Sequence, residues 1–288
     1  MSHFCLPREL PPLYAKMVPG PRIYLMLPDP AHPRVAVISY LNTVPLIWGL
    51  ENGPRRHPFQ LDYCLPSEGA ERIRSGQSDI GILPVIEMAR QRLSYFPGLG
   101  IACDGPVRTI FLISKVPPEQ IRTLTVDRGS RTSVMLARII LSRKFNVHPT
   151  LTVAEPVLDD MLASNDAALI IGDPALLLDP ATLPYLTLDL GHEWKLLTGL
   201  PMVFAVWCGP ANFITPTNSQ LFLDSLAYGE RNMATIVAGQ SALLRLPPDL
   251  VRSYLTENIR FRLGDNEYKG MRTYLEYAAA LEPALEIK

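Results

Sequence analysis

From Arg34 onward, short apolar stretches alternate with segments of helical period, and this alternation constrains the fold more than any other feature of the chain. The stretches "RVAVISY", "FQLDYCLP" and "SDIGILPV" are predicted strands separated by predicted helices. Short β-branched runs between helices are typical of an α/β fold with a mostly parallel sheet. A second series of strands is predicted at "VRTIFLIS", "IRTLTVD", "TLTVAEP" and "DAALIIGD".

Two such series predict two lobes. We assign residues 34–106 and 207–288 to lobe 1 and residues 107–206 to lobe 2, with extended crossings near 105–112 and 201–208. The stretch "PMVFAVWCG" is apolar enough for a central strand, and the residues after it are predicted to be helical. A central cleft between the lobes is where a small molecule is expected to bind.

Residues 1–33 differ from the rest, because prolines recur at positions 7, 11, 12, 19, 21, 28, 30 and 33. They interrupt every apolar run before it reaches the length of a secretory signal. We interpret this segment as a partly ordered extension, or as translated upstream sequence before a later natural start. No run approaches the roughly 20 apolar residues of a membrane span. A cytoplasmic protein without membrane insertion is therefore predicted.

Charge and motif content exclude several function classes. The net charge is -1 and no segment clusters Lys and Arg with aromatic residues, so nucleic acid is not an expected partner. The four cysteines form no CxxC pair, and no two of the five histidines have the spacing of helical zinc ligands. Nucleotide-binding and serine-hydrolase motifs are absent as well. The expectation is that the protein uses neither a metal nor another cofactor.

The first candidate site is the strand-helix junction in "VAVISYLNTVPL", where Ser39, Tyr40, Asn42 and Thr43 bring four polar side chains together. A helix starting at Asn42 or Thr43 could be capped by either side chain, and Pro45 suits its first turn. Capping explains one of these residues. In open α/β sheets, ligands also bind at the carboxyl ends of the strands. This stretch alone supports a structural role and a ligand-binding role about equally.

The second candidate is "TVDRGSRTSVMLARII", where Ser130, Arg131, Thr132 and Ser133 surround the start of a predicted helix. Free N–H groups, the positive end of the helix, several hydroxyls and a guanidinium suit a carboxylate. A capped helix with a solvent-facing Arg is the simpler explanation, but a cap needs only one hydroxyl. The anion-binding interpretation is therefore favoured.

Weaker candidates lie later in the chain. Asp173 follows a glycine after a predicted buried strand, and an aspartate in such a place more often serves a turn or a cap. Thr198 and Gly199 precede the second crossing, where a hinge is expected.

Six stretches taken together resemble the chorismate dehydratases of the futalosine route to menaquinone. They are "ISYLNTVPL", "SDIGILPVIE", "DRGSRTSVMLARIIL", "DAALIIGDPAL", "DLGHEWKLLTGLPMVFAVW" and "YLTENIRFRLGDNEYKGMRTYLEYA". The resemblance covers residues 34–282 in order. It implies a two-lobed type II periplasmic-binding-protein fold and the conversion of chorismate to 3-[(1-carboxyvinyl)oxy]benzoate, a hydro-lyase reaction.

The resemblance also implies roles for the candidate residues. Asn42 would lie nearest the proton transfer, with Ser39 beside the ring of the substrate, and the helix start at Ser130 to Ser133 would hold a carboxylate. Because an amide is a poor general base, we assign Asn42 to orienting the substrate and stabilising charge, with direct proton abstraction as the less favoured role. Tyr40, Thr43, Asp173, Thr198 and Gly199 complete the predicted substrate-binding set.

Two other functions fit the same fold. A solute receptor of a transporter would carry an export signal, which this sequence does not display. A later lyase of the futalosine route would carry a Pro-Cys-Pro-Asn type motif at the first strand-helix junction, and "SYLNTVPL" departs from that motif.

Overall fold

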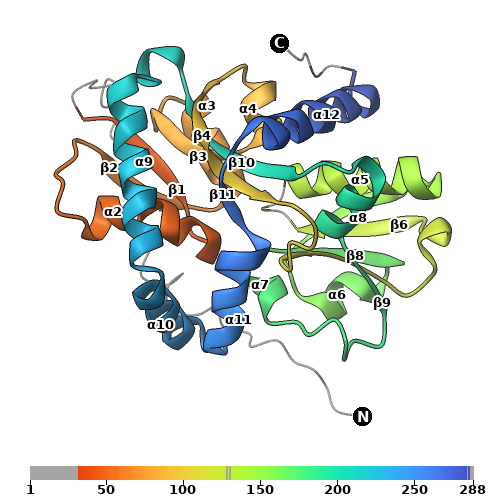
Figure 1. Ribbon diagram of the computed structural model, residues 1–288. Coiled ribbons are helices and arrows are strands. Elements are labelled where there is room, and N and C mark those ends of the chain that lie inside the picture. The colour runs from red at the N-terminus through yellow and green to blue at the C-terminus, as the bar shows by residue number, and fades with distance from the viewer. Residues whose placement is uncertain (1–31, 128, 130, 284, 286–288) are drawn as a thin grey trace.

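The computed structural model describes residues 32–127, 129, 131–283 and 285, so most of the proline-rich segment lies outside the described residues. Two β-sheets lie side by side, each with helices packed on it (Figure 1). The larger sheet has the order β11-β4-β10-β3-β1-β2. Its strands are β1 (Arg34–Ile38), β2 (Gln60–Cys64), β3 (Ile80–Pro84), β4 (Ser94–Cys103), β10 (Met202–Gly209) and β11 (Arg260–Arg262).

The smaller sheet has the order β7-β6-β8-β5-β9. Its strands are β5 (Ile110–Ser114), β6 (Thr123–Asp127), β7 (Thr150–Ala154), β8 (Ala167–Ile171) and β9 (Leu186–Asp189). The chain enters this sheet between β4 and β5 and returns to the larger sheet between β9 and β10. These passages lie near the proposed lobe boundaries, which stay a prediction.

The expectation of mostly parallel sheets was wrong, because both sheets are mixed. Strand β1 pairs in parallel with β2 and β3, and β6 pairs in parallel with β7 and β8. The remaining pairings are antiparallel: β10 with β3 and β4, β11 with β4, and β5 with β8 and β9. The strands that follow the passages between the sheets, β5 and β10, therefore run against the neighbouring strands of the βαβ units. Strand β10 is central and fully buried, as its composition predicts.

Helices cover both sheets. Those that follow strands of the larger sheet are α2 (Val44–Asn52), α3 (Pro66–Arg74), α4 (Val85–Arg90), α9 (Pro216–Arg231), α10 (Met233–Leu244), α11 (Pro248–Ser253) and α12 (Asp265–Leu281). Those that follow strands of the smaller sheet are α5 (Thr132–Phe145), α6 (Leu158–Ala163), α7 (Asp173–Leu176) and α8 (Leu190–Thr198). Short turns of other helical types are η1 (Leu41–Thr43), η2 (Pro118–Gln120), η3 (Ala211–Phe213) and the π-helical η4 (Tyr254–Asn258).

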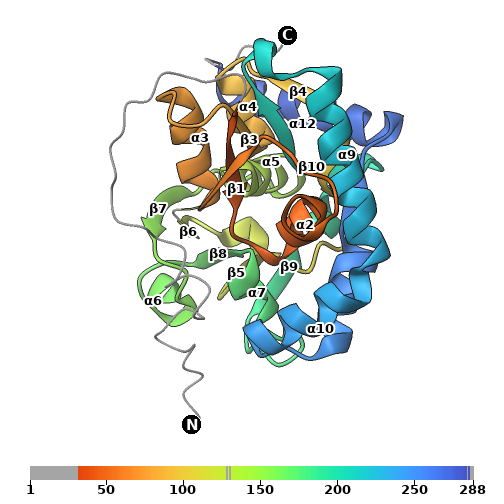
Figure 2. The same cartoon turned by 90° about the vertical axis from the view of Figure 1, so that its left-hand side faces the viewer.

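Helix α2, which follows the first candidate site, is held tightly against α9 (Figures 1 and 2). A Cβ built on Gly49 would lie 2.5 Å from the Cα of Ser225, so only glycine allows this approach. The Ser225 hydroxyl donates to the Leu46 carbonyl and accepts from the Leu50 N–H. The close contact fixes the start of α2, and with it the polar turn before it.

Candidate active site

A cavity opens between the two lobes. It encloses about 560 Å³ of empty space, part of it open to solvent. Its walls are largely apolar, with Ile38 and Ile101 from the larger sheet and Ile110 and Ile171 from the smaller one. Its polar lining consists of Tyr40, Asn42, Thr109, Arg131, Thr132 and Ser133. A largely apolar pocket with a few polar groups is typical of a small-molecule site.

The polar turn after β1 is not a helix cap. The N-cap residue of α2 is Thr43, whose side chain makes no capping bond, and Pro45 lies in the first turn as expected. The Thr43 hydroxyl is buried without a partner among the described residues. The Asn42 side chain instead donates from Nδ2 to the Tyr254 hydroxyl at 3.0 Å. The capping explanation of this stretch was therefore wrong.

Tyr40 and Ser39, the other two polar residues of the turn, differ in whether they reach the cavity. Tyr40 lines the cavity, and its ring lies against Gly172 of the opposite lobe. Ser39 is not among the cavity-lining residues, and its N–H donates to the Cys64 carbonyl at 3.0 Å. Thr43 also lies outside the lining. Of the four predicted residues, Tyr40 and Asn42 reach the cavity.

The start of α5 faces the cavity with an open N-terminus. Its N-cap residue is Arg131, whose side chain makes no capping bond and is exposed at the cavity. Ser133 is buried and lines the same wall. Ser130 lies outside the described residues. Within the described chain, the first turn of this 14-residue helix is not capped by a side chain, so its N–H groups and positive dipole are available to an anion.

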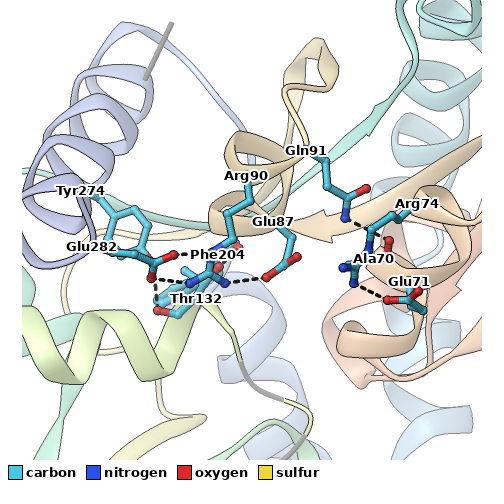
Figure 3. Close-up of polar contacts among 10 residues, drawn as sticks. All are labelled: Ala70, Glu71, Arg74, Glu87, Arg90, Gln91, Thr132, Phe204, Tyr274 and Glu282. Carbon is cyan, nitrogen blue, oxygen red and sulfur yellow. Dashed lines mark hydrogen bonds and ion pairs between the residues drawn. The ribbon is translucent and has the colours of Figure 1, made fainter. Parts of the chain in front are cut away.

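Thr132 is committed to holding this helix start in place (Figure 3). Its hydroxyl donates to the Phe204 carbonyl of β10 at 3.1 Å, and its carbonyl accepts from the Tyr274 hydroxyl of α12 at 3.0 Å. The same view shows Arg90 of α4 between Glu87 and Glu282. Thr132 thus anchors the α5 start to both β10 and α12, and its place in a substrate contact stays a prediction.

Thr198 and Gly199 do not line the cavity. They end α8: the Thr198 hydroxyl donates to the Trp194 carbonyl at 2.9 Å, and Gly199 has a φ of +71° at the C-cap. A glycine is favoured at such a left-handed helix end. This arrangement accounts for both residues by local structure.

Asp173 is a buried link between the two lobes. Its two carboxyl oxygens accept from the Leu41 N–H at 3.1 and 3.2 Å, although Asp173 and Leu41 belong to different lobes. The adjacent Gly172 has a φ of +65°, and a Cβ there would lie 2.8 Å from the Tyr40 ring. Asp173 is not among the cavity-lining residues. Its carboxyl accepts from the N–H of Leu41, the first residue of η1. Asp173 thereby takes the role that a helix-capping side chain of the turn itself would otherwise have.

Burial raises the pKa of the Asp173 carboxyl to about 7, although the Leu41 N–H favours the charged form. A carboxyl with a raised pKa binds more protons in the folded protein than in the unfolded chain. The contribution of Asp173 to the free energy of unfolding is therefore lost as the pH rises from 3.8, the ordinary pKa of this carboxyl, through about 7. Asn in its place cannot ionise and still offers an oxygen to Leu41.

We accordingly expect the melting temperature of Asp173→Asn to rise relative to that of wild type as the pH increases, with the difference growing by about 5–10 °C between pH 5 and pH 8. Melting curves across this range check the prediction. Asp160→Asn, at an exposed carboxylate of α6, is the control for loss of one charge. A difference between Asp173→Asn and wild type that does not change with pH would contradict the assignment.

Sequence reasoning missed two residues at this site, Thr109 and Tyr254. Thr109 lines the cavity from the passage between β4 and β5, and Tyr254 is fully buried behind Asn42. Neither belongs to a polar motif. Tyr254 begins the π-helical turn η4, a type of turn that is frequent at functional sites but has no sequence signature.

Several solved structures of binding proteins have a similar fold. Protein AF1704 of Archaeoglobus fulgidus aligns with a TM-score of 0.70 at 13% identity, covering 87% of this chain and 98% of its own. The periplasmic aliphatic sulphonate binding protein SsuA of Escherichia coli aligns with a TM-score of 0.62 at 14% identity, covering 88% of each chain. The alkanesulfonate-binding protein SsuA of Xanthomonas axonopodis pv. citri, bound to MOPS, aligns with a TM-score of 0.59 at 13% identity. This alignment covers 91% of this chain and 96% of the SsuA chain. The chain therefore has the predicted two-lobed periplasmic-binding-protein fold.

The family is shown by sequence. Residues 33–280 match the family VitK2_biosynth, described as menaquinone biosynthesis. The chain belongs to this family, and the match spans both lobes and every cavity-lining residue. Over the described residues, no helix is long and apolar enough to cross a membrane.

Proposed function

We propose that the protein is a chorismate dehydratase that converts chorismate to 3-[(1-carboxyvinyl)oxy]benzoate and water. Membership in the menaquinone biosynthesis family supports a role in that pathway. The observation that carries the proposal is the pairing of Arg131 and the open start of α5 with Asn42 in one largely apolar cavity. This arrangement suits a ring that carries a carboxylate, which Arg131 and the α5 start would hold, and a polar group, which Asn42 would orient.

The reaction needs little chemical assistance. The C3–H bond of chorismate breaks and its electron pair becomes the C3–C4 double bond as the C4–O bond breaks, so the ring becomes aromatic. The departing hydroxyl takes up the proton that C3 has lost and leaves as water. We propose that a carboxylate of the substrate itself accepts the C3 proton, and that Asn42 orients the ring. Exclusion of water and fixed orientation of the reacting groups can together contribute several kcal/mol.

The proposed roles follow the positions of the residues. Arg131, Ser133 and the N–H groups of the α5 start hold a carboxylate, and Tyr40 covers the cavity beside Gly172. Cytoplasmic localisation accompanies this function as a prediction.

Incubation of the purified protein with chorismate, followed by ultraviolet absorbance and chromatography, tests the proposal. We expect an aromatic enol ether to form, also after treatment with a chelator, because no metal-binding or nucleotide-binding motif occurs in the sequence. Wild-type protein that leaves chorismate unchanged would overturn the proposal.

Binding of an anionic solute without turnover is the second candidate, since the sulphonate-binding proteins SsuA share this fold. The same incubation separates the two functions. A receptor would bind an anion, detectable by calorimetry, and release it unaltered.

A further inference from the structure

Asn42 is the last member of a hydrogen-bonded chain that crosses between the lobes. Its Nδ2 lies 3.0 Å from the Tyr254 hydroxyl, and that hydroxyl lies 3.2 Å from the Thr109 hydroxyl. The Thr109 hydroxyl is also 3.4 Å from the Val107 carbonyl. Both Thr109 and Tyr254 are buried, with 2% and 0% of their surface exposed.

The Val107 carbonyl, at the end of this series of hydrogen bonds, determines which group is the donor in each bond. A carbonyl oxygen can only accept, so the Thr109 hydroxyl donates to Val107. The Tyr254 hydroxyl then donates its single proton to Thr109 and has only acceptor capacity left. The Asn42 amide must therefore turn its NH2 group to Tyr254. The opposite orientation would place two acceptors against each other.

This orientation leaves the amide oxygen of Asn42 for a ligand. Asn42 Oδ1 is buried and has no hydrogen-bond partner in the described chain, while the residue lines the cavity. A buried acceptor without a partner is rare in folded proteins unless something absent from the structure satisfies it. The missing partner must be a donor, such as a hydroxyl group. A carboxylate cannot take that place.

We propose that Tyr254 and Thr109 are positioning residues that hold the oxygen of Asn42 toward the cavity, so that the site selects a ligand presenting a hydroxyl there. The kinetic consequence rests on the proposed function: in chorismate the hydroxyl is the C4 group that leaves. Tyr254 and Thr109 act through Asn42 and need not touch the substrate.

The first test does not depend on activity. Selective 15N-asparagine labelling and NMR report the side-chain NH2 of Asn42, identified by its absence in Asn42→Asp. We expect Tyr254→Phe to shift this pair of signals, since it removes the acceptor of one proton. Tyr268→Phe is the matched control, because its hydroxyl accepts from the Gly98 N–H, away from the cavity. Unchanged Asn42 signals in Tyr254→Phe would overturn the proposal.

The second test uses turnover of chorismate. We expect Tyr254→Phe and Thr109→Val to lower kcat about tenfold with little change in KM, and Thr109→Ser to restore most of it. In an Asn42→Ala background, Tyr254→Phe should have no further effect. Full additivity of the two substitutions would refute an action through Asn42. Wild-type protein that does not turn chorismate over would instead refute the proposed function, and the NMR result would still decide this inference.

Discussion

Asn42→Asp is expected to lower turnover of chorismate by about a hundredfold or more while the melting temperature stays within a few degrees of wild type. Aspartate is nearly the size of asparagine but cannot donate to Tyr254. It also adds a negative charge to a poorly screened cavity that, in the proposed function, binds a dianion. Because the Asn42 side chain caps no helix, the good capping ability of aspartate gives no protection against this loss.

Asn42→Ser and Asn42→Ala test the same position without adding charge. Serine is too short to reach both Tyr254 and a ligand, and alanine removes the amide, so turnover should fall to a similar extent. Asn266→Asp, an exposed site in the first turn of α12, is the control for the charge change and should retain activity. Steady-state kinetics beside thermal melts decide the matter. Wild-type turnover in Asn42→Asp would remove Asn42 from the site.

Much of the fold could be predicted because its strands are short, β-branched and flanked by helices. Strands β1, β3, β6, β8 and β10 fall where their apolar runs are. Strand β4 could not be found in this way, since Pro97, Gly98 and Gly100 inside it indicate a turn. In the structure a Cβ on Gly100 would lie 2.6 Å from the Ala205 carbonyl of β10. The glycine that breaks the sequence pattern is the residue that lets the two strands approach.

Site residues could be predicted where several polar side chains lie together at the boundary between a strand and a helix, and not elsewhere. The junction at Asn42 and the helix start at Arg131 both break the apolar pattern around them, and the structure brings them to one cavity. Thr109 and Tyr254 carry no such signal, because a buried tyrosine looks like any core residue in a sequence. Asp173 was predicted to bind the substrate, but its carboxyl accepts from Leu41 across the lobes. Long-range partners of this kind depend on the fold, which local patterns do not contain.

Arg131→Ala is expected to raise KM for chorismate about 10- to 100-fold with kcat nearly unchanged. One charge-assisted hydrogen bond contributes about 1.5–3 kcal/mol, which corresponds to that loss of affinity. We propose that Arg131 holds the carboxylate that does not accept the C3 proton. That carboxylate keeps its charge from substrate to product, so binding weakens equally in the ground state and the transition state. Arg131 is exposed and has no ion pair with a described residue, so the melting temperature should not fall.

Two further variants sharpen the assignment of Arg131. Arg131→Lys keeps the charge but loses the planar guanidinium, and we expect it to recover part of the affinity. Arg56→Ala removes a positive charge at an exposed position remote from the cavity and should leave KM unchanged. Ser133→Ala should weaken binding less than Arg131→Ala, because its hydroxyl is neutral. If Arg131→Ala instead lowered kcat with KM unchanged, Arg131 would stabilise charge that develops during the reaction, and the carboxylate would have to lie elsewhere in the cavity.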